Sequence, residues 1–556
     1  MPKTDYSSWS KEDLIKKVNA LEKRKKYGLV WDAAREPEKV VLDCQKELPV
    51  LKEIKGNEIH SSNNDAAHIL IESDNYHALS VLNYTHEKSI DIIYIDPPYN
   101  TGAKDWKYNN SYVDENDAWR HSKWLSFMNN RLRLAKNLLK ESGVLICTVD
   151  DNEHAALGLL LQELFPNKEI VCVTIIHNPG GIQGKNFSYC HEYAYFIHPK
   201  GGTYISKVTR EDIGPTPLRD WGKESSKREA AKNCFYPIYI KGNRIVGFGD
   251  ICPDELHPAK SNVYRKDGMI EVYPLDKKGV ERKWRFSRQS VEEIKDELVY
   301  GKIKNEYVIL RLKKDYRWKT VWTDAKYNAN VFGTQLLNSI IKTGFPFPKS
   351  LYAVQDCIKA VIHSKENAVI LDFFAGSGTT GHAVLDLNKQ DGGNRQFILC
   401  TNNENNICTE VCYPRLQKVI NGYRNHKNKN IAGLGGSLKY YRTEFVPASP
   451  TDKNKELLTR RSIEMLTLKE GTFEKVTENA SFVIYRNSDK YTGIIFDQLS
   501  FSQFKKKVAN VDIPISLYIF SLVDDDFSDD FADMRGLIKI CAIPESILRV
   551  YRRIFR

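Results

Sequence analysis

The strongest constraint on the fold is an alternation of short, wholly apolar runs with longer helical segments. Ile90–Ile95 and Val144–Val149 are such runs, which are typical of strands buried on both faces of a sheet. Between them, residues 119–142 carry apolar side chains every three or four positions, as an amphipathic helix does. A helix over 152–165 and a strand over Ile170–Ile176 are expected next. The alternation predicts an α/β fold with a doubly wound sheet.

The same alternation returns later in the chain, after an interruption. Ala368–Asp372 and Arg395–Cys400 are predicted strands, and Gly381–Asn388 is the predicted helix between them. Residues 206–325 differ, because lysine, arginine, tyrosine and tryptophan interleave there with turn residues and short strand-like pieces. This difference indicates an inserted domain and not a continuation of the sheet.

The chain has 556 residues, which is too many for one compact core. We expect a Rossmann-like α/β domain whose two halves are separated by the insertion, followed by a small α+β domain. The predicted segments are an N-terminal helix at 1–30, the first half of the α/β domain at 31–205, the insertion at 206–330, the second half at 331–440 and the C-terminal domain at 441–556.

The predicted N-terminal helix starts after Ser10, which takes the N-cap position, with Asp13 at the capping-box position. Leu14, Val18 and Leu21 make one apolar stripe along it. Such a stripe packs on a partner helix, on a second subunit or on the helix's own domain. The sequence leaves these alternatives open.

Bulk composition argues against a membrane-embedded or secreted protein. Mean hydropathy is −0.47, and no run approaches the ~18 apolar residues that a membrane span needs. The N-terminus has no apolar core of a signal peptide, so we expect an intracellular, cytoplasmic protein. The net charge of +11 suits a polyanionic partner, but it equally suits an ordinary basic enzyme.

The 11 cysteines are scattered, without any Cys-x-x-Cys pair. The closest spacing is Cys408 and Cys412, with Cys400 upstream, whereas a metal site needs a second close pair or suitably spaced histidines. We therefore expect buried, reduced thiols and no metal site. The odd number also argues against a disulfide framework.

The segment Asp96-Pro97-Pro98-Tyr99 follows the first predicted strand directly, at the end where ligands bind in open α/β sheets. Two prolines make the turn rigid, so it can present the Asp96 carboxylate and a backbone carbonyl to one amino group. An exocyclic base amine is a poor nucleophile, and two acceptors that hold its hydrogens favour its attack on a methyl group. Tyr99 supplies a flat face for stacking on an extruded base. The alternative is a plain strand-to-loop turn.

A glycine-rich turn follows the strand Ala368–Asp372, in the segment Asp372-Phe-Phe-Ala-Gly-Ser-Gly-Thr-Thr-Gly381. Glycines let the backbone approach a ligand closely and adopt positive φ angles. Their spacing also matches the dinucleotide fingerprint, and Glu404, after the next strand, could hold the ribose hydroxyls of either ligand. The pairing with Asp-Pro-Pro-Tyr favours methyl transfer, because a hydride-transfer enzyme has no use for that motif.

Together the two motifs resemble those of DNA amino-methyltransferases of the beta arrangement, in which the catalytic half comes first and a target recognition domain precedes the cofactor half. Phe345–Ser350 is similar to the family's extra cofactor segment, although Ser350 stands where proline is common. Asp150–Glu153 also resembles a family pattern. More closely, the chain resembles the modification subunit of type III restriction–modification systems, or a solitary relative, on Leu21–Trp31 and Ile543–Phe555.

The resemblance implies a prokaryotic-type enzyme that uses S-adenosyl-L-methionine to methylate adenine N6 in double-stranded DNA, by base flipping and direct displacement. The implied catalytic residues are Asp96, Pro97, Pro98 and Tyr99. The implied cofactor-binding residues are Asp372, Phe373, Phe374, Ala375, Gly376, Ser377, Gly378, Thr379, Glu404 and Lys349. The candidate DNA-binding residues, from the basic and aromatic insertion, are Trp284, Arg285, Arg317 and Trp318; the alternative for them is a solvated charged face.

The sequence is also compatible with other functions. Cytosine N4 is the alternative target, but serine is commoner than aspartate at the position of Asp96 in such enzymes; RNA is an alternative substrate. Cytosine C5 chemistry is disfavoured because Cys252-Pro253 has the wrong order for the Pro-Cys nucleophile turn. A different class of function is a subunit that chiefly recognises DNA for a partner restriction nuclease-translocase. The resemblance and the N-terminal stripe favour a homodimer.

Overall fold

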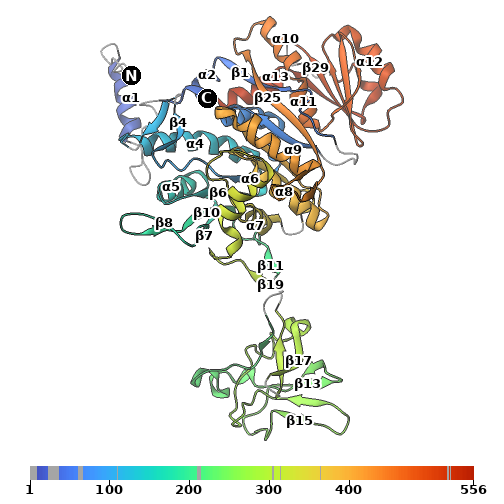
Figure 1. Cartoon of the computed structure of the whole chain (residues 1–556). Helices are drawn as coiled ribbons and strands as arrows, with labels where there is room; N and C mark the ends of the chain where they lie inside the picture. Colours follow the sequence, from blue (N-terminus) through green and yellow to red (C-terminus); the bar gives the residue numbers. More distant parts are fainter. Residues whose placement is uncertain are drawn as a thin grey trace. The chain divides into compact units, whose positions relative to one another are not determined.

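The computed structural model describes residues 9–22, 37–60, 67–108, 111–114, 116–209, 214–303, 306–313, 315–362, 365–522, 525 and 527–555. The chain divides into two compact units (Figure 1). The first comprises residues 1–206 together with 319–556, and the second comprises residues 207–318. The second unit is therefore an insertion in the sequence of the first.

A ten-stranded sheet is the centre of the first unit. From β25 to β6 the neighbouring strands are parallel, whereas β1 and β10 run antiparallel to their neighbours. The predicted α/β fold is confirmed. The strand order is β1 (Glu47–Glu53), β25 (Ser437–Pro447), β2 (Ala67–Glu72), β22 (Gln396–Thr401), β21 (Val369–Asp372), β3 (Ile90–Ile95), β6 (Leu139–Val149), β10 (His191–Pro199), β7 (Lys168–Ile176) and β20 (Val321–Trp322).

The helical connections diverge at the middle of this sheet. Helix α8 (Thr379–Asp391) joins β21 to β22, and α4 (Arg120–Leu138) joins β3 to β6 in the opposite direction along the sheet. Because such crossovers are right-handed, the two helices cover opposite faces. The carboxyl ends of β21 and β3 thus form the topological switch point, where open α/β sheets bind ligands.

The other helices follow this division. Helices α3 (Asn75–Thr85) and α5 (His154–Leu164) pack on α4, whereas α7 (Leu351–Ile362) and α9 (Tyr413–Asn421) pack on α8. All six residues of β3 are buried, as are the last seven of β6. Each large apolar side chain buried in this way stabilises the fold by about 1.5–3 kcal/mol. Continuous burial on both faces explains why these strands show no polar alternation in the sequence.

One predicted helix end is wrong. The periodicity predicted a helix over 119–142, but α4 ends at Leu138 and Leu139 adopts extended angles. The strand β6 begins at Leu139, which pairs with Ile90 at the start of β3. Pairing with a neighbouring strand overrides local helix propensity here.

The C-terminal part is a smaller α+β assembly that packs on the main core. It has a five-stranded sheet with a core of its own, which includes Phe482, Phe504 and Leu517. The predicted start at 441 falls inside β25, because that strand pairs with both β1 and β2. Its elements are β26 (Glu474–Glu478), β27 (Phe482–Arg486), β28 (Tyr491–Ile495), β29 (Ile515–Phe520), β30 (Ile538–Ile543), α10 (Asp452–Arg461), α11 (Ile463–Glu470), α12 (Phe501–Val508) and α13 (Glu545–Ile554).

The second unit consists of short antiparallel strands around a hydrophobic core of its own, in which aliphatic side chains surround Tyr236, Phe248 and Trp284. It is narrower than the predicted insertion at 206–330, since β20 pairs with β7 of the main sheet. Its principal strands are β11 (Lys207–Thr209), β12 (Thr216–Pro217), β13 (Ile238–Lys241), β14 (Arg244–Phe248), β15 (Asn262–Tyr264), β16 (Ile270–Val272), β17 (Leu298–Ile303), β18 (Glu306–Arg311) and β19 (Asp315–Arg317).

The N-terminal helix is α1 (Lys11–Glu22). Its predicted cap is confirmed, because Asp13 N donates to Ser10 Oγ over 3.1 Å. Leu14 and Val18 of the predicted stripe are exposed, whereas the side chain of Leu21 and residues 23–31 lie outside the described part of the chain. Among the helices of the described residues, none is long and apolar enough to cross a membrane.

The first unit also contains several short elements. They are α2 (Lys39–Asp43), the hairpin of β4 (Ala103–Tyr108) and β5 (Ser111–Asp114), the hairpin of β8 (Ile182–Gln183) and β9 (Ser188–Tyr189), α6 (Leu336–Ile340) preceded by the π-helical turn η6 (Asn330–Gln335), the 3-10 turn η7 (Glu404–Asn406), and the hairpin of β23 (Gly422–Arg424) and β24 (Asn430–Ala432).

Candidate active site

The predicted catalytic motif lies at the switch point, where it begins at the residue after β3. One oxygen of Asp96 is held by the protein: Tyr99 Oη and Thr148 Oγ1 each donate to Oδ1 over 2.7 Å. Lys349 Nζ lies 3.3 Å from the same oxygen. The carboxylate is therefore fixed in position by three groups that all engage one of its two oxygens.

Two acceptors of the motif remain unused. In the part of the chain that the structure describes, Asp96 Oδ2 accepts no hydrogen bond, although the Asp96 side chain is only 25% exposed. The carbonyl of Pro98 accepts from Trp124 Nε1 over 2.7 Å, whereas that of Pro97 has no donor among the described residues. The arrangement thus offers a carboxylate oxygen and the Pro97 carbonyl to an incoming amino group.

Lys349 and Glu192 form a buried pair next to this carboxylate. Lys349 donates to both Glu192 and the Tyr99 hydroxyl, and Tyr99 Oη lies 3.2 Å from Glu192 Oε2. Burial would raise the pKa of Glu192, but the Lys349 ammonium lowers it below its usual value. Burial would lower the pKa of Lys349, but Asp96 and Glu192 raise it. Both groups are therefore charged at neutral pH.

The electrostatic setting also keeps Tyr99 neutral. Burial, with the carboxylates of Asp96 and Glu192 nearby, raises the pKa of Tyr99 well above its usual value. Lys349 Nζ lies over the Tyr99 ring, 4.5 Å from its centroid. One face of the ring is therefore occupied by a cation, which leaves stacking to the opposite face.

Asn100, the residue after the motif, fixes the turn through buried contacts. Asn100 is fully buried, has a positive φ of 57° and donates its side-chain amide to Glu153. Glu153 also pairs with His121 Nδ1 at 2.6 Å. Asparagine tolerates this left-handed conformation better than most residues. These contacts, with the Trp124 bond to Pro98, make the turn rigid.

The glycine-rich turn joins β21 to α8 at the adjacent strand end. Gly376 and Gly378 have positive φ angles of 49° and 75°. Asp372 is buried beneath the turn, where it accepts from Phe374 N at 2.9 Å and Thr380 Oγ1 at 2.5 Å. Burial raises the pKa of Asp372 to about 7, in spite of these two donors. In this arrangement Asp372 organises the turn from within.

A buried arginine supports the turn from the other side. Arg415 of α9 donates to Ser377 O (3.3 Å), Ser377 Oγ (3.1 Å) and Thr379 Oγ1 (2.8 Å), and it contacts His382 Nδ1 at 3.3 Å. No carboxylate among the described residues pairs with it. Burial lowers the pKa of Arg415 to about 10, so it stays charged at neutral pH.

The remaining predicted cofactor residues lie around this turn. Phe374 is half-buried and packs against Phe127 and Phe373, while Ala375 N donates to Cys400 O over 3.1 Å. Glu404 lies in η7, three residues after β22, and its carboxylate accepts from Lys107 Nζ of β4 over 3.1 Å. Lys349, predicted as a cofactor residue, instead contacts the catalytic motif.

The predicted DNA-binding residues, all in the second unit, separate into two groups. The prediction for Trp284 is wrong: this side chain is 2% exposed, lies in the hydrophobic core of the second unit and donates Nε1 to Tyr236 O over 2.8 Å. An indole that packs a core presents no face to a duplex. Arg285 and Arg317 are exposed, and Trp318 is half-buried.

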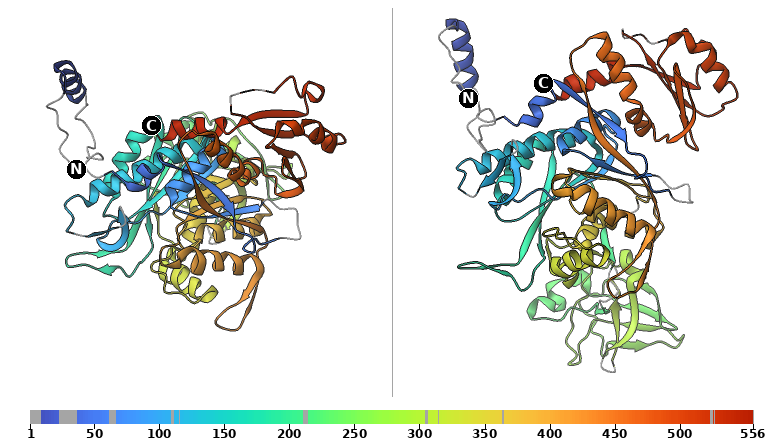
Figure 2. Two further views of the ribbon diagram at one scale, coloured as in Figure 1. Left: turned by 90° about the horizontal axis from the view of Figure 1, so that it is seen from above. Right: turned by 45° about the horizontal axis from the view of Figure 1, so that its top comes forward.

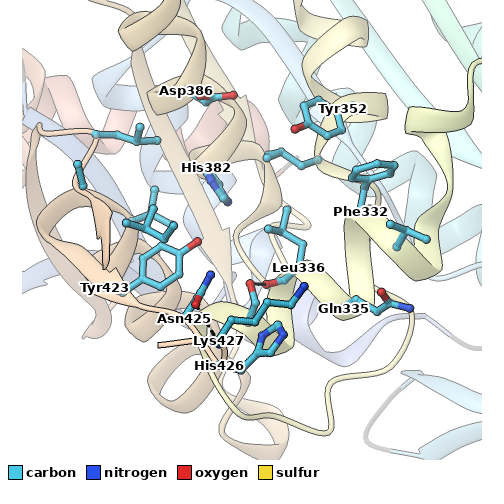
Figure 3. Close-up of a pocket in the computed structure, with 17 residues that line it drawn as sticks. Phe332, Gln335, Leu336, Tyr352, His382, Asp386, Tyr423, Asn425, His426 and Lys427 are labelled. Carbon is cyan, nitrogen blue, oxygen red and sulfur yellow. Dashed lines mark hydrogen bonds between the residues drawn. The ribbon is translucent and has the colours of Figure 1, made fainter. Parts of the chain in front are cut away.

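Figure 3 shows a separate pocket of about 480 Å³ in the first unit. It lies among η6, α6, α7, α8, α9 and the β23–β24 hairpin, and its walls include Phe332, Tyr352, His382, Tyr423 and Lys427. None of the predicted site residues lines it. Its link to the glycine-rich turn is His382, which contacts Arg415.

Sequence reasoning missed several residues that shape the site, among them Trp124, Thr148, Glu192 and Arg415. Glu192 left one signal, since it is a carboxylate at the start of an otherwise apolar and aromatic strand. Thr148 and Trp124 left none, because their roles depend on bonds to Asp96 and Pro98 from distant parts of the chain.

A doubly wound sheet that places a glycine-rich turn beside Asp-Pro-Pro-Tyr defines an amino-methyltransferase. A family model described as DNA methylase, for the N6 and N4 enzymes, matches residues 90–411, which is more than half of the chain. The chain belongs to this family, whose members use S-adenosyl-L-methionine as the methyl donor. The open glycine backbone between β21 and α8, with the Glu404 carboxylate at the next strand end, fits that cofactor.

Similar proteins come from several sources. Type II methyltransferase M.KpnI of Klebsiella pneumoniae is 29% identical over 389 residues, which are 67% of this chain and 89% of M.KpnI. The type III EcoPI Mod subunit of Escherichia phage P1 is 29% identical over 408 residues, which are 64% of this chain but 60% of that subunit. The solved structure of a putative DNA modification methylase from Thermus thermophilus, complexed with S-adenosyl-L-methionine, is 14% identical over 67% of this chain and 99% of that one, with a TM-score of 0.32.

Proposed function

We propose that the chain is a site-specific DNA methyltransferase that modifies N6 of adenine in duplex DNA. One observation carries the proposal: Asp96 Oδ2 and the Pro97 carbonyl are unused acceptors, among the described residues, at the switch point beside the glycine-rich turn. The catalytic roles are those of Asp96, Pro97, Pro98 and Tyr99. Asp372–Thr379 and Glu404 would hold the cofactor. Lys349 would lie between the catalytic half and the cofactor half of the α/β domain.

The chemistry is a direct displacement, in which bound S-adenosyl-L-methionine supplies an electrophilic methyl group. Asp96 Oδ2 and the Pro97 carbonyl accept the two hydrogens of the amine, so that its lone pair turns away from the ring and towards the methyl group. Lys349 and Thr148 keep the carboxylate from rotating. Catalysis by this site is mainly positioning, since no covalent intermediate is required.

The target base must leave the DNA duplex to reach this site. Tyr99 has one ring face under the Lys349 ammonium, so the base stacks on the opposite face. Base–aromatic stacking of this kind contributes about 1–3 kcal/mol, which offsets part of the cost of extrusion. Adenine is favoured over cytosine because the motif starts with aspartate.

The second unit is the candidate target recognition domain. Arg285, Arg317 and Trp318 are its candidate contacts, whereas Trp284 is withdrawn because it is buried. We expect the arginines to bind phosphates and to contribute to the salt dependence of binding. The test is to replace Arg285 and Arg317 by alanine. If DNA affinity and its dependence on salt concentration do not change, these arginines do not bind phosphates.

The partners follow from the likeness to Mod subunits, of which this chain spans about three fifths. We infer that the protein acts as a homodimer in the cytoplasm, that it associates with the nucleoid when bound, and that it is a candidate partner of a restriction subunit. Sedimentation of the protein with and without DNA tests the dimer.

Single-molecule sequencing of genomic DNA tests the function directly. Cells that express the chain should show methyladenine confined to one short motif, and cells with Asp96→Ala should show none. The purified Asp96→Ala protein should still bind S-adenosyl-L-methionine and the DNA site. Methylcytosine would move the target to N4, and no transfer by the wild-type protein would favour a pure recognition subunit or an RNA substrate.

A further inference from the structure

A thin hairpin stands at the catalytic edge of the main sheet. Strands β8 and β9 form it between β7 and β10, and Figures 1 and 2 show it projecting from the ends of those two strands. His177 N and Asn178 N both donate to Cys190 O over 3.1 Å and close its base. Because β10 runs antiparallel to both β6 and β7, and β6 is parallel to β3, the end of β7 and the start of β10 lie at the carboxyl edge of the sheet, which is also where Asp96 follows β3.

One face of the hairpin is apolar and uncovered. Ile182 lies directly opposite Tyr189, and Phe187 is two residues from Tyr189, so their side chains share one face. These side chains are 59%, 49% and 78% exposed, respectively. Single exposed apolar residues are ordinary, but three on one side of a two-stranded ribbon indicate a binding surface.

Gly184 gives this face its shape. Its N donates to Phe187 O over 3.0 Å, and a Cβ at this position would lie 2.8 Å from that oxygen and 3.1 Å from the Tyr189 ring. A side chain here would therefore displace Tyr189. The glycine keeps the ribbon thin at this position, and Phe187 is the most exposed of the three apolar side chains.

The charge of the hairpin suits a polyanion. Residues 177–191 include no aspartate or glutamate, and Lys185 lies at the tip between the two strands. Asn186 is beside it, and Gln183 and Ser188 occupy the opposite, polar face. An apolar face framed by a lysine and neutral hydrogen-bonding groups is compatible with DNA.

The hairpin is continuous with the catalytic cluster. Glu192, which bonds to Lys349 and Tyr99, is the second residue of β10. Phe187 is five residues earlier, so the two lie at most ~17 Å apart at about 3.4 Å per residue. That is roughly five base-pair steps. The hairpin is therefore within reach of the base pairs that flank a base bound at Asp96.

We propose that this hairpin is a DNA wedge. Its Phe187 inserts into the base stack of the duplex at the position from which the target adenine has been extruded. The inference rests on the proposed function, because only an enzyme that extrudes a base leaves such a gap. Apolar side chains that insert between base steps unstack and kink a duplex. Phe187 fills the vacated place, and Ile182 and Tyr189 support it from the same face of the ribbon.

The test compares single-turnover methylation of two duplexes that carry the motif found by sequencing. In one the target adenine is paired, and in the other it faces an abasic site, so that no base pair has to be broken before the adenine leaves the duplex. Phe187→Ala should slow methylation of the paired duplex about tenfold or more, the value of one lost stacking partner, but change the unpaired duplex less than about threefold. Phe187→Trp should restore the paired rate, and Gln183→Ala on the polar face is the matched control.

A second readout separates extrusion from chemistry. 2-Aminopurine at the target position should brighten when the wild-type protein binds, and should brighten less with Phe187→Ala. Equal losses on both duplexes, or no loss on either, would overturn the wedge while leaving the proposed function intact. If Phe187→Ala sediments as a monomer where the wild type is a dimer, the wedge would also be overturned, because the apolar face would then be an interface between two copies of the chain. If the wild-type protein methylates neither duplex, the proposed function fails first.

Discussion

Lys349 Nζ lies 3.3 Å from Asp96 Oδ1, although the two residues belong to different halves of the divided α/β domain. The same ammonium donates to Glu192, so one cation joins the segment before α7 to strands β3 and β10. The insertion separates these halves in sequence, and this contact holds them together at the switch point.

Removal of that cation should destabilise the first unit. Lys349→Met leaves the Glu192 carboxylate buried without its partner, and we expect a loss of about 3–5 kcal/mol in the free energy of unfolding. The double variant Lys349→Met/Glu192→Gln should recover much of it. Urea denaturation measures both. Lys107→Met, which breaks the exposed pair with Glu404, should change stability little; a single variant at 349 that is as stable as this control would contradict the buried-pair argument.

Arg415 should determine how well the glycine-rich turn binds the cofactor. Arg415→Ala removes three hydrogen bonds to Ser377 and Thr379, and charge-assisted bonds contribute about 1.5–3 kcal/mol each. We expect S-adenosyl-L-methionine to bind at least ~10-fold more weakly by calorimetry. Arg395→Ala is the control, because this arginine is also buried but pairs with Asp391 at the far end of α8. Equal effects of the two variants would indicate general destabilisation.

Asp372 should make stability depend on pH. Burial raises its pKa to about 7 in the folded protein, whereas an unfolded aspartate has a pKa of about 3.9. Between these values the folded state binds more protons at Asp372, so the stabilisation present at low pH is lost as pH rises through 7. In Asp372→Asn this fall should be absent. Denaturation midpoints of both proteins at pH 5 and pH 8 provide the measurement, and parallel profiles would show that Asp372 does not titrate in this way.

A side chain at Gly378 should destabilise the protein for two separate reasons, a positive φ angle and a close contact. Its φ is 75°, and an added Cβ would lie 3.1 Å from Cys412 Sγ. Gly392 at the other end of α8 has the same φ but nothing within 4 Å of an added Cβ. We expect Gly392→Ala to cost about 1–2 kcal/mol of stability from the positive φ alone, and Gly378→Ala to cost more and to weaken cofactor binding. If the two variants behave alike in both assays, the close approach to Cys412, just before α9, is unimportant.

The alternation of apolar runs and helices, and the two turns that follow Ile95 and Asp372, were enough to predict the doubly wound sheet and the location of the chemistry at the carboxyl ends of its strands. These features are local: continuous apolar runs form buried parallel strands, and proline or glycine at a strand end restricts the backbone wherever the strand is placed. The family resemblance added the cofactor and the order of the two halves.

Only the tertiary structure decided which groups surround each motif. Thr148 meets Asp96 because β6 lies beside β3 in the sheet, and Glu192 of the next strand, β10, reaches Tyr99 and Lys349; strand neighbours are not encoded within any one strand. The same reason applies to errors: Leu139 joined β6 through its pairing with Ile90, and Trp284 became core because the second unit packs around it. Local sequence determines which elements form and where they turn, whereas burial and pairing between distant segments determine which side chains meet.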